Sequence, residues 1–361
     1  MYSDGDLEAA VEAGALTPEA AAALRGFTAA RAASPIVDEE HFRLVTGFND
    51  IFVSIAAALL LAAVAWLGAQ VWPAFGPAAT AAASWALAEY FTRARRMALP
   101  SILLLGAFVL GVFGAVFAAL LLGTAGADAH VTFDDGSAEA RLAALKAAVA
   151  AACAAGAAWL HWRRFRVPIT VAAGAGAGVG LLFALVIAAV PQAQAHVRVL
   201  LFVGGIAVFA LAMRWDMADP ARITRRSDVA FWLHLLAAPL IVHPIFSALG
   251  LLDASATGGL AAAIALLLYA GLAAVALAVD RRALMVSALV YVLAAFGELF
   301  RTVGDASTSL ALTGLLIGSA LLLLSAFWHR ARRAVVMRLP GELRRRLPIL
   351  DRDATPTRRP A

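Results

Sequence analysis

The fold class is decided by the stretch RARRMALPSILLLGAFVLGVFGAVFAALLL, residues 93–122. Three Arg residues come first, and no charged side chain follows from Met97 to Leu122. A helix rises about 1.5 Å per residue, so about 20 apolar residues cross the roughly 30 Å of hydrocarbon in a bilayer. The stretch therefore predicts a membrane-spanning helix over 98–122, with basic residues at the membrane surface before it.

The rest of the chain has the same character. Of its 361 residues, 63% are hydrophobic and 15% are charged, and the mean hydropathy is +0.84. Because soluble domains carry about 25% charged residues, this composition excludes an ordinary soluble protein, a disordered chain and a nucleic-acid-binding module. We predict an all-α, polytopic membrane helix bundle with about ten spans, at residues 51–70, 75–91, 98–122, 142–161, 168–190, 199–213, 229–250, 259–279, 283–300 and 308–328.

The orientation follows from the Arg residues between the spans. One alternating set of loops holds 12 Arg residues and the other set holds three. Loops rich in Arg and Lys stay in the cytoplasm, so we expect both termini to be cytoplasmic. All but one of the 29 basic residues are Arg. Together with the abundance of Ala, this bias indicates a GC-rich bacterial genome and hence a bacterial inner membrane. The 12 are Arg93, Arg95, Arg96, Arg163, Arg164, Arg166, Arg214, Arg222, Arg225, Arg226, Arg281 and Arg282.

Two further regions flank the ten-span bundle of residues 51–328. Residues 1–50 predict a cytoplasmic helical hairpin followed by a short interfacial helix at 38–48. Gly14 is expected to end the first hairpin helix, and Thr17 to cap the second. Residues 329–361 form a basic cytoplasmic tail with ten Arg and three acidic residues. Anionic lipid head groups are the partner that this charge favours.

Ionisable groups inside spans are costly and often functional. Glu89 lies near a span end with Arg93 four residues later, and Glu298 has Arg301 three residues later, so both predict surface pairs. Lys146 and His161 are expected to extend towards opposite membrane surfaces.

The remaining polar groups lie deeper. His234 and His243 share the seventh span, but nine residues place them on opposite helix faces. His243 precedes Pro244, which lacks the N–H for the carbonyl of Leu240. A histidine beside an opened helix can relay protons or bind a ligand, or simply pack at the kink. His243 is therefore the first candidate for a functional polar group, followed by the central Tyr269 and Tyr291.

Small residues indicate where helices pack closely. Gly174/Gly178 and Gly176/Gly180 form two overlapping GxxxG pairs on nearly opposite faces of the fifth span. Such pairs let neighbouring helices approach closely. Gly111 belongs to a similar stripe of small residues in the third span. These glycines predict packing contacts.

No motif for catalysis or cofactor binding is present. The chain has no phosphate-binding loop, no HExxH, no CxxC and no GxSxG. Cys153 is its single cysteine. The outer loop 123–141 contains five acidic or His residues, but their spacing does not match a calcium loop and a solvated loop is expected. We therefore predict no catalytic residues, no metal and no cofactor.

The N-terminal stretch DLEAAVEAGALTPEAAAALRGF, residues 6–27, followed by an Ala- and Leu-rich body, resembles bacterial families of predicted membrane proteins of unknown function. The resemblance covers about the first 70 residues. It implies a membrane location and brings no catalytic residues. Ten spans also allow an analogy to transporters built from two inverted five-span repeats.

Short loops, glycine-rich helices and the absence of catalytic motifs favour a carrier for a small, fairly apolar molecule. Two alternatives remain open. One is a membrane enzyme that acts on lipid with His243 as a base. The other is a scaffold or sensor that does not transport.

Overall fold

The computed structural model describes residues 10–24, 48–125, 138–220, 222, 224–248, 259–301 and 306–348. All regular structure in these ranges is helical and none of it is strand, so the predicted all-α fold class is confirmed. The chain divides into two units, one comprising Met1–Phe42 with Ile349–Ala361 and the other comprising Arg43–Pro348. The predicted interfacial helix and most of the outer loop 123–141 lie outside the described residues.

In the smaller unit, the described residues are 10–24. Gly14 has a φ of +70°, which a glycine adopts without steric cost. The Thr17 hydroxyl accepts a hydrogen bond of 3.2 Å from the Ala20 amide, as an N-cap residue does. Both local predictions for this segment are confirmed.

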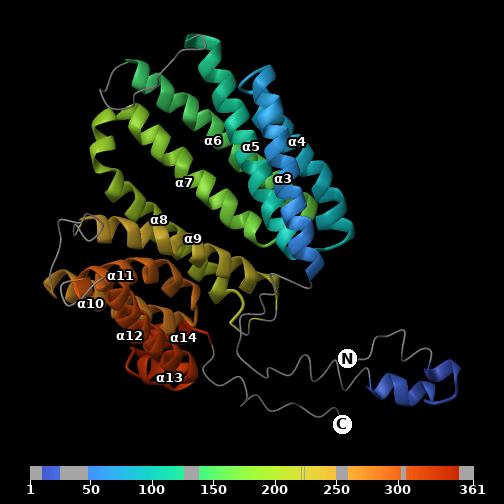
Figure 1. Ribbon diagram of the computed structural model, residues 1–361, viewed down its shortest axis with the longest axis vertical. Helices are drawn as coiled ribbons and strands as arrows, with labels where there is room; N and C mark the ends of the chain where they lie inside the picture. The colour runs from blue at the N-terminus through green and yellow to red at the C-terminus, as the bar shows by residue number, and fades with distance from the viewer. Residues whose placement is uncertain are drawn as a thin grey trace. The chain divides into compact units, whose positions relative to one another are not determined.

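The larger unit is a succession of helices (Figure 1). Most neighbours along the chain pack against each other, and α9 also contacts both α7 and α11. The elements are α3 (Phe48–Val71), α4 (Phe75–Ala88), the π-helical η1 (Glu89–Ala94), α5 (Ala98–Ala125), α6 (Ala138–Phe165), α7 (Ile169–Ala189), the 3-10 helix η2 (Pro191–His196), α8 (Val197–Met217), α9 (Arg225–Ala248), α10 (Gly259–Val279), α11 (Ala283–Arg301), α12 (Ala306–Ala326), α13 (Trp328–Met337) and α14 (Gly341–Arg346).

Each of the ten predicted spans overlaps a helix. Within the described ranges, six helical stretches are long and apolar enough to cross a membrane, namely α3, α5, α6, α7, α9 and the run Pro191–Met217. A seventh results if Leu310–Ala326 and Trp328–Met337, which are bent by 76°, count as one span. Helix α4 has only 14 residues, and the apolar parts of α10 and α11 are also short. The count of ten and the orientation of the termini therefore stay predictions.

On α6, small side chains are buried while large apolar ones are exposed, and α3 also exposes large apolar side chains. Helix α6 buries nine Ala residues and His161, while its Leu145, Val149 and Trp159 are about half exposed. On α3, Trp66 and Leu67 are exposed by 71% and 67%. Small residues let helices approach closely, and large apolar side chains on the outside suit a hydrocarbon environment. These apolar faces are compatible with membrane insertion.

Four connections between successive helices contain a described non-glycine residue in the left-handed region. They connect η1 to α5, α6 to α7, α8 to α9 and α10 to α11, and each contains a non-glycine residue with a positive φ of 54° to 59°. The residues are Arg96, Arg166, Arg222 and Asp280. The left-handed region is costly for residues with a Cβ atom. All four turns belong to the Arg-rich set of loops, so their cationic side chains are held close to helix ends.

Candidate functional site

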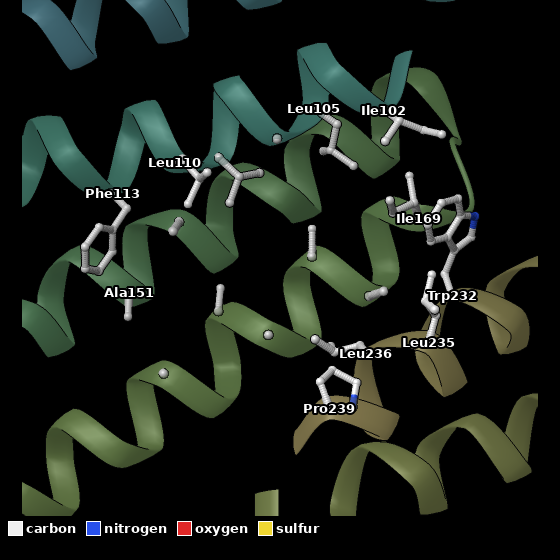
Figure 2. A pocket seen from close by; sticks show the side chains of 18 residues that line it. Ile102, Leu105, Leu110, Phe113, Ala151, Ile169, Trp232, Leu235, Leu236 and Pro239 are labelled. Carbon is white, nitrogen blue, oxygen red and sulfur yellow. The ribbon is translucent and has the colours of Figure 1, made fainter. Parts of the chain in front are cut away.

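A pocket of about 660 Å³ lies between α5, α6, α7 and α9. Figure 2 shows its lining, in which Leu110 and Phe113 come from α5 and Leu236 and Pro239 from α9. We call it the glycine-walled pocket, because Gly106, Gly176 and Gly180 line it. Apart from the indole of Trp232, its lining side chains carry only carbon and hydrogen.

The sequence of α7 accounts for the hollow. The run AAGAGAGVG at residues 172–180 alternates Ala and Gly, so this helix projects almost no side-chain volume towards α5 and α9. A Cβ atom added at Gly180 would meet no atom within 4 Å, and one added at Gly176 would lie 3.7 Å from Leu236. The space left by these glycines is not filled by a neighbouring helix.

The predicted packing glycines therefore differ in their surroundings. A Cβ atom at Gly111 would lie only 2.8 Å from the Pro77 carbonyl oxygen, so this residue permits close contact between α4 and α5. At Gly174 the nearest atom would be 3.6 Å away, and at Gly178 nothing lies within 4 Å. Gly68 and Gly76 are in still closer contact, since a Cβ atom added at Gly68 would lie 2.7 Å from the Gly76 Cα atom.

A buried histidine lies beside one wall of the pocket. His161 is fully buried, and its Nδ1 lies 3.2 Å from the Thr170 hydroxyl. The rings of Trp85, Phe108 and Phe165 surround it, with centroids 4.5 to 6.2 Å away. The expectation that His161 extends to the membrane surface was wrong, because Thr170 across the turn supplies a hydrogen-bond partner inside.

A cluster of buried charges lies where α8, α9, α10 and α13 end or begin. We call Asp216, Arg222, His234, Asp280, Arg281 and Arg332 the buried charge cluster. Asp216 forms an ion pair with Arg281 and lies 2.8 Å from His234 Nε2. Arg281 also donates to the Ser227 carbonyl at 3.0 Å. Buried charges are tolerated where such partners surround them.

Asp280 organises the other half of the cluster. It accepts hydrogen bonds from Arg222 at 3.0 Å and from the Trp328 indole at 2.8 Å, and Arg332 lies 3.5 Å away. Arg332 in turn donates to the Pro348 carbonyl at 2.8 Å. These contacts attach α13, the start of the predicted basic tail, to the turn between α10 and α11. The side chains of the cluster are nearly fully buried, so the cluster holds these helices together and leaves no space for a ligand.

Sequence reasoning missed this cluster. The available signal was the presence of Asp216 and Asp280 within loops otherwise rich in Arg, since acidic residues there suggest paired charges. For His234 and His243, the expected separation on two faces is confirmed, because His234 is fully buried and His243 is exposed.

The structure brings together two of the three predicted polar residues. His243 Nδ1 lies 2.9 Å from the Tyr291 hydroxyl, and the Tyr291 ring packs on Phe246 with centroids 4.9 Å apart. Tyr269 belongs to the apolar cluster of α9, α10, α11 and α12 against which Tyr291 packs, and its hydroxyl forms no hydrogen bond with His243 or Tyr291. The hydrogen bond between His243 and Tyr291 joins α9 to α11, and neither residue lines the glycine-walled pocket.

At the end of α4, Glu89 pairs with Arg93 at 3.2 Å as expected. It also accepts two hydrogen bonds from Arg164 of α6, at 2.7 and 2.9 Å. No side chains in the described ranges form a group of three or more metal-ligating residues. Comparisons of the chain with protein-family models, with curated proteins and with solved structures found no match in any of the three.

Proposed function

We propose that this chain is a multi-pass membrane protein that binds and carries a small, apolar molecule in the glycine-walled pocket. The observation that carries the proposal is the pocket itself, about 660 Å³ of space bounded by four helices and lined almost entirely by carbon. Ligand pockets commonly have volumes of about 300–1,000 Å³, so the space suits a molecule of ordinary metabolite size.

The lining defines the chemical class of the ligand. A charged or strongly polar solute would lose its hydration without gaining partners, because no ionised side chain lines the pocket. A hydrocarbon chain or an apolar ring system loses little and gains contacts with Leu110, Phe113 and Leu236. The proposed ligand is therefore a hydrocarbon-like molecule with few polar atoms.

Two features of the walls support carriage as well as binding. Pro239 interrupts the hydrogen-bond ladder of α9 on one side of the pocket, and proline positions are where helices bend. On the facing side, α7 presents glycines with open space around them. A change in the bend of α9 would alter the width of the pocket without breaking backbone hydrogen bonds elsewhere.

A photoreactive probe tests the binding step. The full chain in lipid nanodiscs is irradiated with a long-chain alcohol carrying a diazirine, and the labelled peptides are identified by mass spectrometry. Labelling is expected in residues 102–113, 169–180 and 232–239. Gly180→Leu fills the pocket and reduces this labelling by about tenfold, equivalent to about 1.4 kcal/mol.

Gly178→Leu is the matched control, because it lies on the same helix, has equal space and is not part of the lining. It should leave the labelling unchanged. Labelling spread over the exposed face of α3 and unaffected by Gly180→Leu would contradict the proposal. Transport is then tested by measuring the flux of compounds of the labelled class across the membrane of proteoliposomes that contain the protein.

The proposed location is a bacterial inner membrane, with ten spans and both termini in the cytoplasm. Its support is the division of Arg residues between loops, 12 against three. In a Cys153→Ala background, Gln194→Cys in η2 should react with an impermeant maleimide in intact cells. Ala94→Cys in η1 should react only after permeabilisation. The reverse pattern would reject this orientation.

The lipid-enzyme alternative has one observation in its favour. The imidazole of His243 is oriented by the Tyr291 hydroxyl at 2.9 Å on an exposed face, and a base needs such positioning. If the chain is an enzyme with this base, both His243→Ala and His243→Gln abolish turnover of a lipid substrate while Gly180→Leu does not.

A further inference from the structure

A second pocket, of about 190 Å³, lies between α10, α11, α12 and the start of α13. Its walls are largely apolar and include Leu289, Leu321 and Leu324. The polar side chains in its lining are Tyr269, Arg282, Ser325 and the indole of Trp328. We call it the tyrosine pocket. It shares no lining residue with the glycine-walled pocket.

Arg282 supplies a cation at the end of the pocket near the α10–α11 turn. Its guanidinium carbon lies 4.9 Å from the centre of the Trp328 ring. The same indole donates to Asp280 at 2.8 Å, so the ring is held in place. Asp280, the nearest carboxylate along the chain, already pairs with Arg222 and Arg332. Within the described part of the chain, no carboxylate pairs with Arg282.

Tyr269 supplies a hydroxyl deeper inside. Its side chain is 91% buried, since 9% is exposed, and its hydroxyl has no hydrogen-bond partner among the described residues. Tyr269 lies ten residues before the end of α10 at Val279, about 15 Å along the helix axis. A buried hydroxyl without a partner is unfavourable, and a ligand with a neutral acceptor atom would satisfy it.

The tyrosine pocket also opens to the apolar exterior. Val286 lines it and is 59% exposed. Leu322 and Leu323, next to the lining residues of α12, are exposed by 72% and 59%. Acyl chains of the bilayer would cover this surface, so a ligand can enter sideways from the membrane. This inference rests on the proposed membrane location but not on the ligand of the glycine-walled pocket.

We propose that the tyrosine pocket binds one anionic phospholipid. The phosphate lies at the Arg282 guanidinium, where a charge-assisted hydrogen bond forms. A neutral acceptor oxygen of the same lipid accepts from the Tyr269 hydroxyl, and an acyl chain lies along Leu289 and Leu321. This site differs from electrostatic attraction by the basic tail, which depends on the number of Arg residues and not on a hydroxyl or a pocket shape.

Native mass spectrometry of the full chain tests the proposal. The delipidated protein is titrated with phosphatidylglycerol or phosphatidylcholine of identical acyl chains, and the first bound lipid is quantified. Phosphatidylglycerol is expected to bind more tightly. Arg282→Gln should weaken its binding by about tenfold, and Tyr269→Phe by about threefold, as expected for one charged and one neutral hydrogen bond.

Arg330→Gln is the matched control. Arg330 stacks on Phe327, with its guanidinium carbon 5.6 Å from the ring centre, in the same region but outside the lining. Arg330→Gln removes one positive charge and should not change the affinity for the first phosphatidylglycerol. Val286→Trp blocks the opening while keeping every charge, and should weaken binding as strongly as Arg282→Gln. Circular dichroism verifies that each variant is folded.

Several results would overturn the proposal. Equal losses in Arg282→Gln and Arg330→Gln would show that only the total charge matters. Retained binding in Val286→Trp would place the lipid elsewhere. Oleate displacing phosphatidylglycerol at equal concentration would identify a free carboxylate as the ligand. Gly180→Leu should not alter phosphatidylglycerol binding, so failure here is distinguishable from failure of the carrier proposal.

Discussion

The glycine-walled pocket and the buried charge cluster lie on two faces of the same helix, α9. Leu236 and Pro239 face the pocket, whereas His234 belongs to the cluster and bonds to Asp216. The pocket has space and no ionised side chain, and the cluster has charges and no space. A buried charge needs a partner close by, so the charges of this cluster hold helices together, while the carbon-lined pocket is left open for a ligand.

The largest effect is expected for Asp216→Ala, which tests whether the buried charge cluster holds the helices together. The substitution leaves the guanidinium of Arg281 buried without its carboxylate, and removal of one partner from a buried pair costs about 3–5 kcal/mol. The free energy of unfolding in SDS, followed by circular dichroism, should fall by that amount.

The control is Glu342→Ala, because Glu342 pairs with Arg345 on an exposed surface, where such pairs contribute about 0–1 kcal/mol. A loss of stability that is no larger for Asp216→Ala than for Glu342→Ala would mean that the cluster does not hold the helices together.

A second experiment separates packed glycines from glycines that border space. Gly111→Ala places a Cβ atom 2.8 Å from the Pro77 carbonyl oxygen and 3.0 Å from the Ala81 amide, and overpacking costs about 1–3 kcal/mol. Gly180→Ala meets nothing and should gain up to about 1 kcal/mol from helix propensity. The same unfolding assay measures both variants, and destabilisation by Gly180→Ala would argue against an open pocket.

A third experiment concerns His243 and Tyr291, whose hydrogen bond joins α9 to α11. His243→Ala and Tyr291→Phe each remove the same hydrogen bond, so each should cost about 0.5–1.5 kcal/mol. The double variant should cost less than the sum of the two, because the bond can be lost only once. Additive losses would mean that the two side chains do not interact.

The smallest effect is expected in a turn. Arg96 has a φ of 54°, and its side chain has no place in the buried charge cluster. Arg96→Gly removes the steric cost of the left-handed region, so the free energy of unfolding should rise by at most about 1 kcal/mol. Gly106→Ala, in the middle of α5 with open space around it, should also be mild. A marked loss for Arg96→Gly would show that the Arg96 side chain contributes to stability.

The fold class and the helix positions could be predicted from sequence, because long apolar runs interrupted by Arg clusters have few alternatives. Individual partners could not. Glu89 predicts its local partner Arg93, four residues away, but its bidentate partner Arg164 is 75 residues away. Contacts between residues on different helices depend on how the helices are arranged. The residue periodicity within one helix does not contain this information.

The sequence by itself determined that apolar helices follow one another, that Arg residues gather in alternate loops, and that residues 172–180 of α7 are Ala and Gly apart from one Val. These are properties of composition and spacing along one chain. Only the tertiary structure decided that His161 is enclosed by Trp85 and Phe165, that Asp216 neutralises Arg281, and that Gly180 borders a hollow while Gly111 touches a backbone. The reason is physical: a glycine has no side chain, and whether a neighbouring helix occupies the space beside it depends on how the helices pack.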